Sequence, residues 1–238
     1  VTGWQAENRR AGNRPQTFRI GTGTGTAALR FRNAENCFNL NGLGKAAANS
    51  LQAAQSTPAD FARLLAAAGI PPFEAGRLAE ATAARLQQTG ALWADGSEWL
   101  QVEGVTAAHW ALAGRLLCTL PNREAMALDL NGLTAAEAPL LAGAGLNAAE
   151  ARRVLAARPE GGWGSAGEFW RQASAGGVPQ TATAQAAGTS SRWVLLDLTA
   201  RSGQAILHRQ LLLDTAHRPA RVARTVWRQA AETEGGQP

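Results

Sequence analysis

The sequence has no Tyr, one Met, three His and two Cys, and Lys45 is the only Lys among its 238 residues. His109, His208 and His217 lie far apart and have no spacing typical of a metal site or a catalytic pair. No Cys-x-x-Cys pair or Cys/His cluster occurs, so a zinc site is not expected. Nucleophile-elbow, zinc-protease and phosphate-loop motifs are also missing, and we therefore expect no enzyme.

The two cysteines, Cys37 and Cys118, leave two possibilities open. In an oxidising compartment they form one disulfide, which would stabilise the fold by about 4 kcal/mol through loop closure. Otherwise they are two unrelated buried thiols. Their spacing alone does not decide between these interpretations.

Long apolar runs are missing too. No stretch of about 18 apolar residues occurs, so we expect no membrane-spanning helix within this sequence. A secretory signal is not recognisable either. The opening residues, VTGWQAENRRAG, are typical of a helix that begins before Val1.

The composition is that of a globular protein, with 45 % hydrophobic and 17 % charged residues. The net charge is +5 and comes almost entirely from Arg. A basic chain is able to contact nucleic acid or anionic membranes. Because the arginines are scattered along the sequence, we favour ordinary solvated faces over a binding patch.

One segment of the chain is repeated. CFNLNGLG begins at Cys37 and LDLNGLT begins at Leu128. Downstream, LLAAAGIPPFEAGR (residues 64–77) matches LLAGAGLNAAEARR (residues 140–153). The first copy carries an additional polar stretch, KAAANSLQAAQSTP. Such self-similarity indicates one structural unit that is used twice.

Helix signals recur in both copies. Gly69 and Gly145 follow Leu-Leu pairs, as expected for glycines that end a helix. The first helix of each copy has its own cap, in Thr57-Pro58 and in Thr134 with Glu137. Acids at the start of the next helix suit the helix dipole: Glu74 and Glu150. Each copy therefore predicts helix, glycine turn, helix and a third helix anchored by Trp or Phe, as in a SAM-like or helix-hairpin-helix unit.

The FNLN and LDLN segments alternate apolar and polar residues, so we expect short extended segments that lead into each helical copy. Asn41 and Asn131 suit a turn, and the following Gly42 and Gly132 allow positive φ.

The flanks of the repeat have β-strand patterns. QTFRIGTGTGTAALRFRN predicts a hairpin with a Gly-Thr loop, and this loop is not expected to cradle an anion because it opens no helix. After the repeat, two apolar runs are joined by Arg201-Ser202-Gly203, and a third, ARVARTVWRQ, follows Pro219. These patterns predict one sheet that is interrupted by a helical insertion.

The paired helices also suggest DNA binding, because helix-hairpin-helix units hold phosphates with backbone N–H groups. The turn at Gly143–Gly145 is followed by no basic residue before Glu150, and the first copy has Pro71-Pro72 at this point. We favour packing over nucleic-acid contact, and keep a helix-hairpin-helix DNA-binding protein as the alternative function.

Four stretches together resemble the minor pseudopilin K of the type II secretion system, the GspK family, over most of the chain. These stretches are CFNLNGL, DFARLLAAAGI, LPNREAMALDLNGLTAAEAPLLAG and ARRVLAARPEGGWGSAGEFW. The resemblance implies an α+β fold, in which a pilin-like N-terminal helix end and antiparallel sheet are interrupted by two SAM-like units. The expected parts are residues 1–41 (helix end and first strands), 42–118 and 119–187 (helical units), 188–230 (C-terminal strands) and 231–238 (disordered tail).

The resemblance also implies a non-catalytic subunit at the tip of the periplasmic pseudopilus. Its expected partners are the minor pseudopilins I and J and the secretion machinery, with H as a further candidate and no nucleic acid. Membrane contact is expected only through an N-terminal helix outside this sequence, which anchors such subunits in the inner membrane. For partner binding we expect Trp4, Arg9 and Arg10, on a helix that continues to about Arg14. Trp4 alternatively covers its own sheet.

The family carries an acidic calcium-binding loop in its first helical module, and here only Asp95 and Glu98 remain of it. Calcium takes about six to eight oxygen ligands, so we expect no structural calcium and no other cofactor. A disulfide between Cys37 and Cys118 is expected in its place, as a clamp between the helical insertion and the sheet.

Overall fold

The computed structural model describes residues 16–22, 25–43, 56–124, 128–175 and 187–228. The chain divides into two compact units. The sheet unit comprises residues 1–35 and 191–238, and the helical unit comprises residues 36–190. The chain therefore passes between the units twice, after Glu35 and after Ser190.

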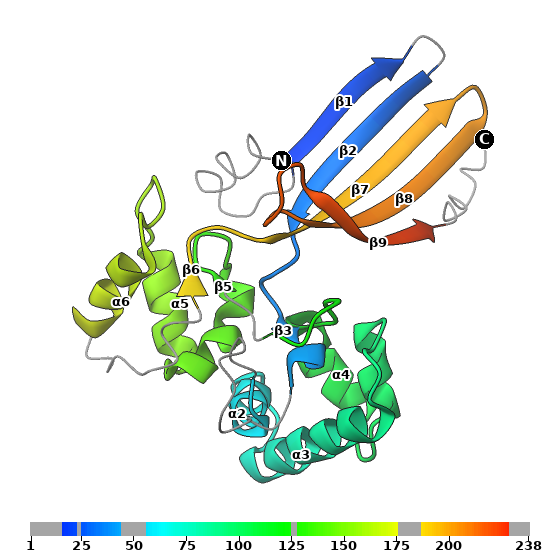
Figure 1. The fold of residues 1–238 in the computed structure, drawn as a ribbon. Helices are drawn as coiled ribbons and strands as arrows, with labels where there is room; N and C mark the ends of the chain where they lie inside the picture. The colour runs from blue at the N-terminus through cyan, green and yellow to red at the C-terminus, as the bar shows by residue number, and fades with distance from the viewer. Residues whose placement is uncertain (1–15, 23–24, 44–55, 125–127, 176–186, 229–238) are drawn as a thin grey trace, which may run out of the picture. The chain divides into compact units, whose positions relative to one another are not determined.

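The sheet unit contains five antiparallel strands in the order β1-β2-β7-β8-β9 (Figure 1). Their bounds are β1 Gln16–Thr22, β2 Gly25–Asn33, β7 Trp193–Ser202, β8 Ala205–Asp214 and β9 Arg221–Arg228. Strands β2 and β7 pair in the middle of the sheet, with Leu29 opposite Leu198, although the whole helical unit lies between them in the sequence. The predicted hairpins, the single sheet and its helical interruption are confirmed.

The register gives the sheet two different faces, because residues directly opposite each other on paired strands share a face. One face, here called the apolar face, is lined by Ala27, Leu29, Phe31, Val194, Leu196, Leu198, Leu211, Leu213 and Trp227. The other, here called the basic face, presents Arg19, Arg30, Arg32, Asp197, Arg201 and Arg224. A small core forms on the apolar face around the buried Val194, Leu211 and Leu213.

Each copy of the repeat begins and ends with a strand of two residues. In the first copy, β3 (Phe38–Asn39) pairs in parallel with β4 (Leu117–Cys118). In the second, β5 (Leu128–Asp129) pairs in parallel with β6 (Ala187–Gly188). The predicted extended entry segments are thus present, and each is tied to the end of its own copy.

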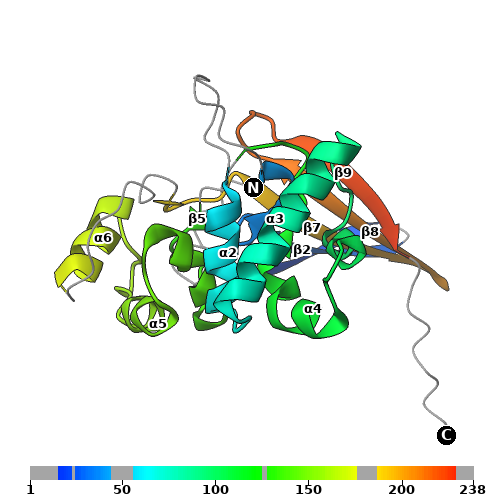
Figure 2. The same cartoon turned by 90° about the horizontal axis from the view of Figure 1, so that it is seen from below.

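Helices fill the space between these strand pairs. The first copy contains η1 (Leu40–Gly42), α2 (Pro58–Ala67), α3 (Pro72–Thr89), η2 (Gly96–Gln101), α4 (Ala107–Ala113) and η3 (Gly114–Leu116). The second contains η4 (Ala135–Ala144), α5 (Ala148–Ala156) and α6 (Ala166–Ala175). Helices α2 and α3 lie side by side in both views (Figure 1 and Figure 2).

Most of the predicted helix ends are confirmed. Thr57 caps α2 through Asp60, and Pro58 is the first helical residue. Thr134 and Glu137 form the predicted capping box, and Gly69 and Gly145 have positive φ. The helix after Thr134 is a 3₁₀ helix, consistent with Pro139 inside it, which has no N–H to donate to an α-helical hydrogen bond.

Gly42 and Gly132 do not use the positive φ that glycine allows, because neither is among the left-handed glycines of the described chain. Gly42 is required for a different reason. A Cβ atom there would lie 2.4 Å from the carbonyl oxygen of Glu124. The small residue therefore allows two backbone segments to approach closely.

Aromatic residues form the core of the helical unit. Phe38 stacks on Phe61 with ring centroids 4.8 Å apart, and Phe61 meets the edge of Trp99 at 5.9 Å. In the second copy, Phe169 contacts both Trp163 and Trp170. Trp99 and Phe169 are fully buried, as expected for the residues that anchor the third helix of each copy.

Candidate functional site

The residues predicted to bind partners, Trp4, Arg9 and Arg10, lie outside the described residues, as does the helix expected up to about Arg14. The candidate site is therefore built from the features that hold the entry and exit of each helical copy, and from the surfaces of the sheet.

Cys37 and Cys118 form a disulfide bond, with an S–S distance of 2.07 Å and Cα atoms 5.7 Å apart. Cys118 lies in β4, and Cys37 immediately precedes its partner strand β3. Because both cysteines belong to the helical unit, the bond joins the beginning and the end of the first copy. The expected clamp between the insertion and the sheet is therefore wrong, although the pairing itself is confirmed.

The Asn of each NGL motif makes two hydrogen bonds to the backbone of one Trp, which we did not predict from the sequence. The side-chain Nδ2 of Asn41 donates to the carbonyl oxygen of Trp93, and its Oδ1 accepts from the N–H of the same Trp. Asn131 makes the same two bonds with Trp163. Asn41 and Asn131 are both buried, so each amide satisfies backbone groups that water does not reach.

The Trp partners occupy equivalent places in the two copies. Trp93 precedes Glu98-Trp99 by five residues, and Trp163 precedes Glu168-Phe169 by the same spacing. The pattern Trp-x4-Glu-aromatic was therefore available in the sequence as a signal for this tie. We name the two arrangements the Asn–Trp ties.

Arg158 strengthens the tie of the second copy. Its Nη1 donates to the carbonyl oxygen of Asn131 at 2.9 Å, and its Nη2 donates to the carbonyl oxygens of Leu130 and Leu133. The guanidinium also lies 5.2 Å from the centre of the Trp163 ring. Burial lowers the pKa of Arg158, while the nearby Asp129 and Glu137 act in the opposite direction.

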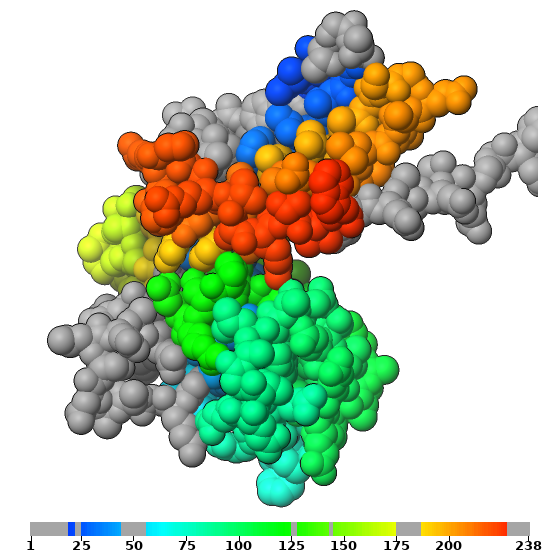
Figure 3. Space-filling model, turned by 45° about the vertical axis from the view of Figure 1, so that its right-hand side comes forward, coloured from blue at the N-terminus to red at the C-terminus, as the bar shows by residue number. Residues whose placement is uncertain are grey.

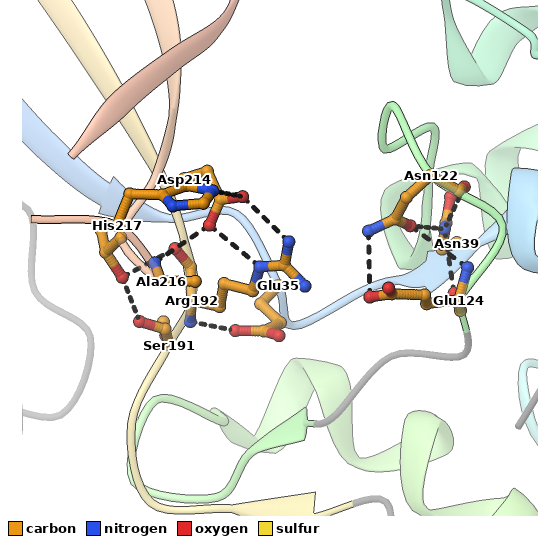
Figure 4. A network of polar contacts seen from close by, with 10 residues as sticks. Glu35, Asn39, Asn122, Glu124, Ser191, Arg192, Asp214, Ala216 and His217 are labelled. Carbon is orange, nitrogen blue, oxygen red and sulfur yellow. Dashed lines mark hydrogen bonds and ion pairs between the residues drawn. The ribbon is translucent and has the colours of Figure 1, made fainter. Parts of the chain in front are cut away.

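Polar side chains also hold the entry strand of the first copy. Asn39 Nδ2 donates to the side chain and backbone oxygens of Asn122 and to the carbonyl oxygen of Glu124 (Figure 4). Its Oδ1 accepts from the N–H of Leu120. The segment after β4 is therefore fixed to β3 by one buried amide.

A second network belongs to the sheet unit. Arg192 forms a bidentate ion pair with Asp214, with Nε–Oδ1 and Nη2–Oδ2 distances of 2.9 Å each (Figure 4). The backbone N–H of Arg192 donates to Glu35, and that of Ala216 donates to Asp214. The hydrogen bonds from Arg192 hold the pKa of Asp214 below its usual range, against the opposing effect of burial. This network joins the start of β7 to the end of β8.

Asp95 and Glu98, the two carboxylates considered as calcium ligands, already accept hydrogen bonds from backbone N–H groups. Asp95 accepts from the N–H of Ser97, and Glu98 accepts from the N–H groups of Ala94 and Asp95. The two carboxylates thus cap η2. Within the part of the chain that the structure describes, no group of three or more His, Cys, Asp or Glu is placed to hold a metal.

The histidines have separate surroundings. His109 is in α4, where its Nδ1 accepts from the N–H of Thr106 and its Nε2 lies 3.2 Å from Glu74. His208 contacts Thr199 on the basic face, and His217 lies in the turn after β8. Each of the three histidines therefore has a different set of neighbours.

The helical hairpin considered for DNA binding has no basic residue at its turn. In the second copy, Asn147 caps α5 and Glu150 completes the capping box. In the first copy, Pro71 stands at this position and makes no side-chain cap. The backbone N–H groups that a phosphate would need at α5 are already bound to Asn147.

Among the described residues, no helix has both the length and the apolar character needed to cross a membrane. This finding concerns only residues 16–22, 25–43, 56–124, 128–175 and 187–228.

Comparison with known proteins gives three consistent findings. Residues 130–190 match the family described as type II secretion system (T2SS), protein K. A curated relative from Escherichia coli (strain K12), named as a type II secretion system protein K, is 28 % identical over 193 residues. That alignment covers 69 % of this chain and 58 % of the relative, so the chain spans less than two thirds of the relative's length.

The fold also matches a solved structure. A chain of the crystal structure of the GspK-GspI-GspJ complex from enterotoxigenic Escherichia coli aligns with a TM-score of 0.66 at 19 % identity. The match covers 90 % of this chain and 84 % of that chain. Together with the sequence matches, it confirms the resemblance to the type II secretion protein K family.

Proposed function

We propose that this protein is a non-catalytic minor pseudopilin at the tip of the type II secretion pseudopilus, where it initiates or caps the filament for protein export. The observation that supports this most is the interrupted sheet. Strands β2 and β7 are neighbours, yet residues 36–190 lie between them, and this order of elements aligns with the GspK-GspI-GspJ structure over 90 % of the chain.

The insertion gives a physical reason for a position at the tip. A helical unit of this size, with its own core and its own disulfide, does not rearrange to admit another subunit. A filament that ends in such a subunit is blocked at that end. In this proposal both copies are SAM-like or helix-hairpin-helix units, with the bounds 42–118 and 119–187.

The apolar face of the sheet suits a pilin-type helix. Such a face is normally covered, because apolar side chains on a sheet gain free energy when they leave water. We assign this role to a helix that ends near Arg14, with Trp4, Arg9 and Arg10 contacting partner helices. The alternative remains that Trp4 covers the apolar face of its own sheet.

The proposal places the protein in the periplasm, anchored in the inner membrane before assembly by a helix that precedes Val1. An exported location agrees with the Cys37–Cys118 bond, because disulfides persist in oxidising compartments. The minor pseudopilins I and J are the proposed partners, since a matching chain was solved in a complex of that composition. H is a further candidate.

The test is light scattering on a sizing column, with this chain mixed with the soluble parts of the I and J minor pseudopilins from the same source. A stable species of one copy each is expected. Three separate peaks at about micromolar concentration would contradict the proposal, because obligate assembly interfaces persist at that dilution. A DNA titration would then test the alternative function.

Variants separate the two interpretations of Trp4. If Trp4 binds a partner, Trp4→Ala weakens the complex and leaves the unfolding temperature of the isolated chain unchanged. If Trp4 covers its own sheet, the unfolding temperature falls instead. Arg9→Ala/Arg10→Ala is the companion variant. The matched control is Arg152→Ala/Arg153→Ala, which removes the same charge from exposed positions of α5.

A further inference from the structure

The positive charge of this protein is concentrated in one unit. The sheet unit contains 13 Arg against six Asp or Glu, whereas the helical unit contains ten Lys or Arg against 12 Asp or Glu. A general preference for Arg in the sequence would raise the charge of both units. The excess therefore belongs to the sheet unit specifically.

Within the sheet, the register gathers the scattered arginines on one face. Arg19 and Arg30 lie on neighbouring strands β1 and β2, and Arg32 follows Arg30 on the same face. Arg201 of β7 is opposite Thr26, and Arg224 of β9 is opposite Leu212. Arg19, Arg30 and Arg201 are exposed, and Arg32 and Arg224 are half-buried. Arginines that are scattered along the sequence are therefore gathered on one face of the sheet.

Acidic residues do not balance this face. This face includes the alternate residue pairs of β2 and β7 from Thr26–Arg201 to Arg32–Leu195, together with their neighbours on β8. Among these described residues, Asp197 is the one acidic residue. Asp197 is already held by Arg32 at 3.0 Å and by Gln210 at 2.6 Å. Arg209, on the opposite face, lies over the Trp227 ring.

We propose that the basic face is a docking surface for an acidic protein. Charge complementarity identifies the partner's chemistry, because each planar guanidinium group is able to pair with a carboxylate through two parallel hydrogen bonds. Thr199, His208 and Gln210 lie on this face, together with the apolar Leu195, Ile206 and Leu212. The three polar side chains suit a hydrogen-bonded interface.

The same face fits other anionic partners less well. The one aromatic residue among its described positions, Trp193, is buried, so this face offers no exposed platform on which nucleic-acid bases would stack. The exposed Trp227 of β9 is on the opposite face. Among its described positions, the basic face therefore also presents no exposed aromatic anchor of the kind that is typical of surfaces bound to membranes. Figure 3 shows β9, in red, at the surface of the sheet unit.

The test uses labelled poly-L-glutamate as the probe and fluorescence anisotropy of the full chain at about 50 and about 200 mM NaCl. We expect binding that weakens as the salt concentration rises. The variant Arg19→Gln/Arg30→Gln/Arg201→Gln is expected to bind about tenfold more weakly, since each exposed pair contributes modestly. The control Arg85→Gln/Arg152→Gln/Arg153→Gln loses the same charge from the helical unit and is expected to change affinity less than about twofold.

The corresponding triple Arg→Lys variant shows whether a loss of binding comes from the changed side chains or from misfolding. It keeps the charge and loses the paired hydrogen bonds, so an intermediate affinity is expected. Equal effects of the sheet and control variants would overturn the proposal, because binding would then follow net charge alone. Tighter binding to phosphatidylglycerol vesicles or to duplex DNA than to poly-L-glutamate, abolished by the same Arg→Gln variant, would also overturn it by replacing the acidic protein with a different partner.

Discussion

Asn131 and Trp163 are 32 residues apart and are joined by two hydrogen bonds of 2.9 Å each, while Asn41 and Trp93 are 52 residues apart and are joined in the same way. One side-chain amide thus closes loops of different length with the same geometry. The tie occurs in both copies although their helices differ, since α2 is an α-helix and η4 is a 3₁₀ helix. The conserved element of the repeat is therefore this tie, more than the helices that it encloses.

Loss of this tie is expected to destabilise the protein strongly. Asn131→Ala leaves the N–H and the carbonyl oxygen of Trp163 unpaired in a buried position, and we expect the free energy of unfolding to fall by about 2–4 kcal/mol. Asn131→Asp is expected to be no better, because its carboxylate has no donor for that carbonyl. Urea unfolding of each variant measures the change.

A matched control is Asn147→Ala. Asn147 also accepts two backbone N–H bonds, but as the exposed cap of α5, so we expect a loss of about 1 kcal/mol. An Asn131→Ala variant that lost no more stability than Asn147→Ala would show that the buried tie has no special role.

Local signals predicted much of the fold. Thr57, Thr134, Gly69 and Gly145 act within a few residues of their own position, and their capping and turn roles are confirmed. The apolar runs of β7 and β8 likewise predicted a hairpin. The sequence contains each of these signals within one short window, so no knowledge of the tertiary fold is needed.

Long-range features were predicted less well. Gly42 must be small because the backbone of Glu124 approaches it, and Asn41 can be buried because it binds the backbone of Trp93. Neither partner is near in the sequence. The arginines of the basic face are spread over 200 residues, so only the register of five strands brings them together. The cysteine pair was predicted, but which two segments it joins depended on the division into units.

The disulfide is expected to stabilise the helical unit considerably. It joins residues 81 apart, and closing a loop of that length removes enough entropy from the unfolded chain to contribute about 4 kcal/mol. Cys37→Ser/Cys118→Ser should therefore lower the free energy of unfolding by about that amount. Mass measurement of the native chain, with and without reduction, should differ by two hydrogens, and two free thiols in the unreduced chain would disprove the bond.

The ion pair between Arg192 and Asp214 predicts a dependence on pH. Because the pKa of Asp214 is lower in the folded chain than in the unfolded chain, its ionised form favours folding. This contribution is complete above the unfolded pKa of about 4 and disappears as the pH falls through the folded pKa. Asp214→Asn should therefore destabilise the protein at pH 7, and the difference from the native chain should shrink in acid.

Arg192 is partly exposed, with 38 % of its side chain accessible, so we expect the loss at neutral pH to be only about 1–2 kcal/mol. Thermal unfolding between about pH 7 and about pH 2.5 measures it. Asp197→Asn, on the basic face, serves as the control. A difference between the native chain and Asp214→Asn that grew in acid would contradict the assignment.

Calcium is expected to have no effect on stability, because Asp95 and Glu98 already bind backbone N–H groups at the start of η2. An ion would have to break these bonds and find about four more oxygen ligands. Millimolar calcium or a chelator should therefore shift the unfolding temperature by less than about 1 °C. Glu98→Gln removes a charge-assisted cap, worth about 1 kcal/mol, and should lower it by about 2–4 °C with or without calcium. A rise of several degrees with calcium, absent with magnesium and lost in Glu98→Gln, would instead place a calcium site at these two carboxylates.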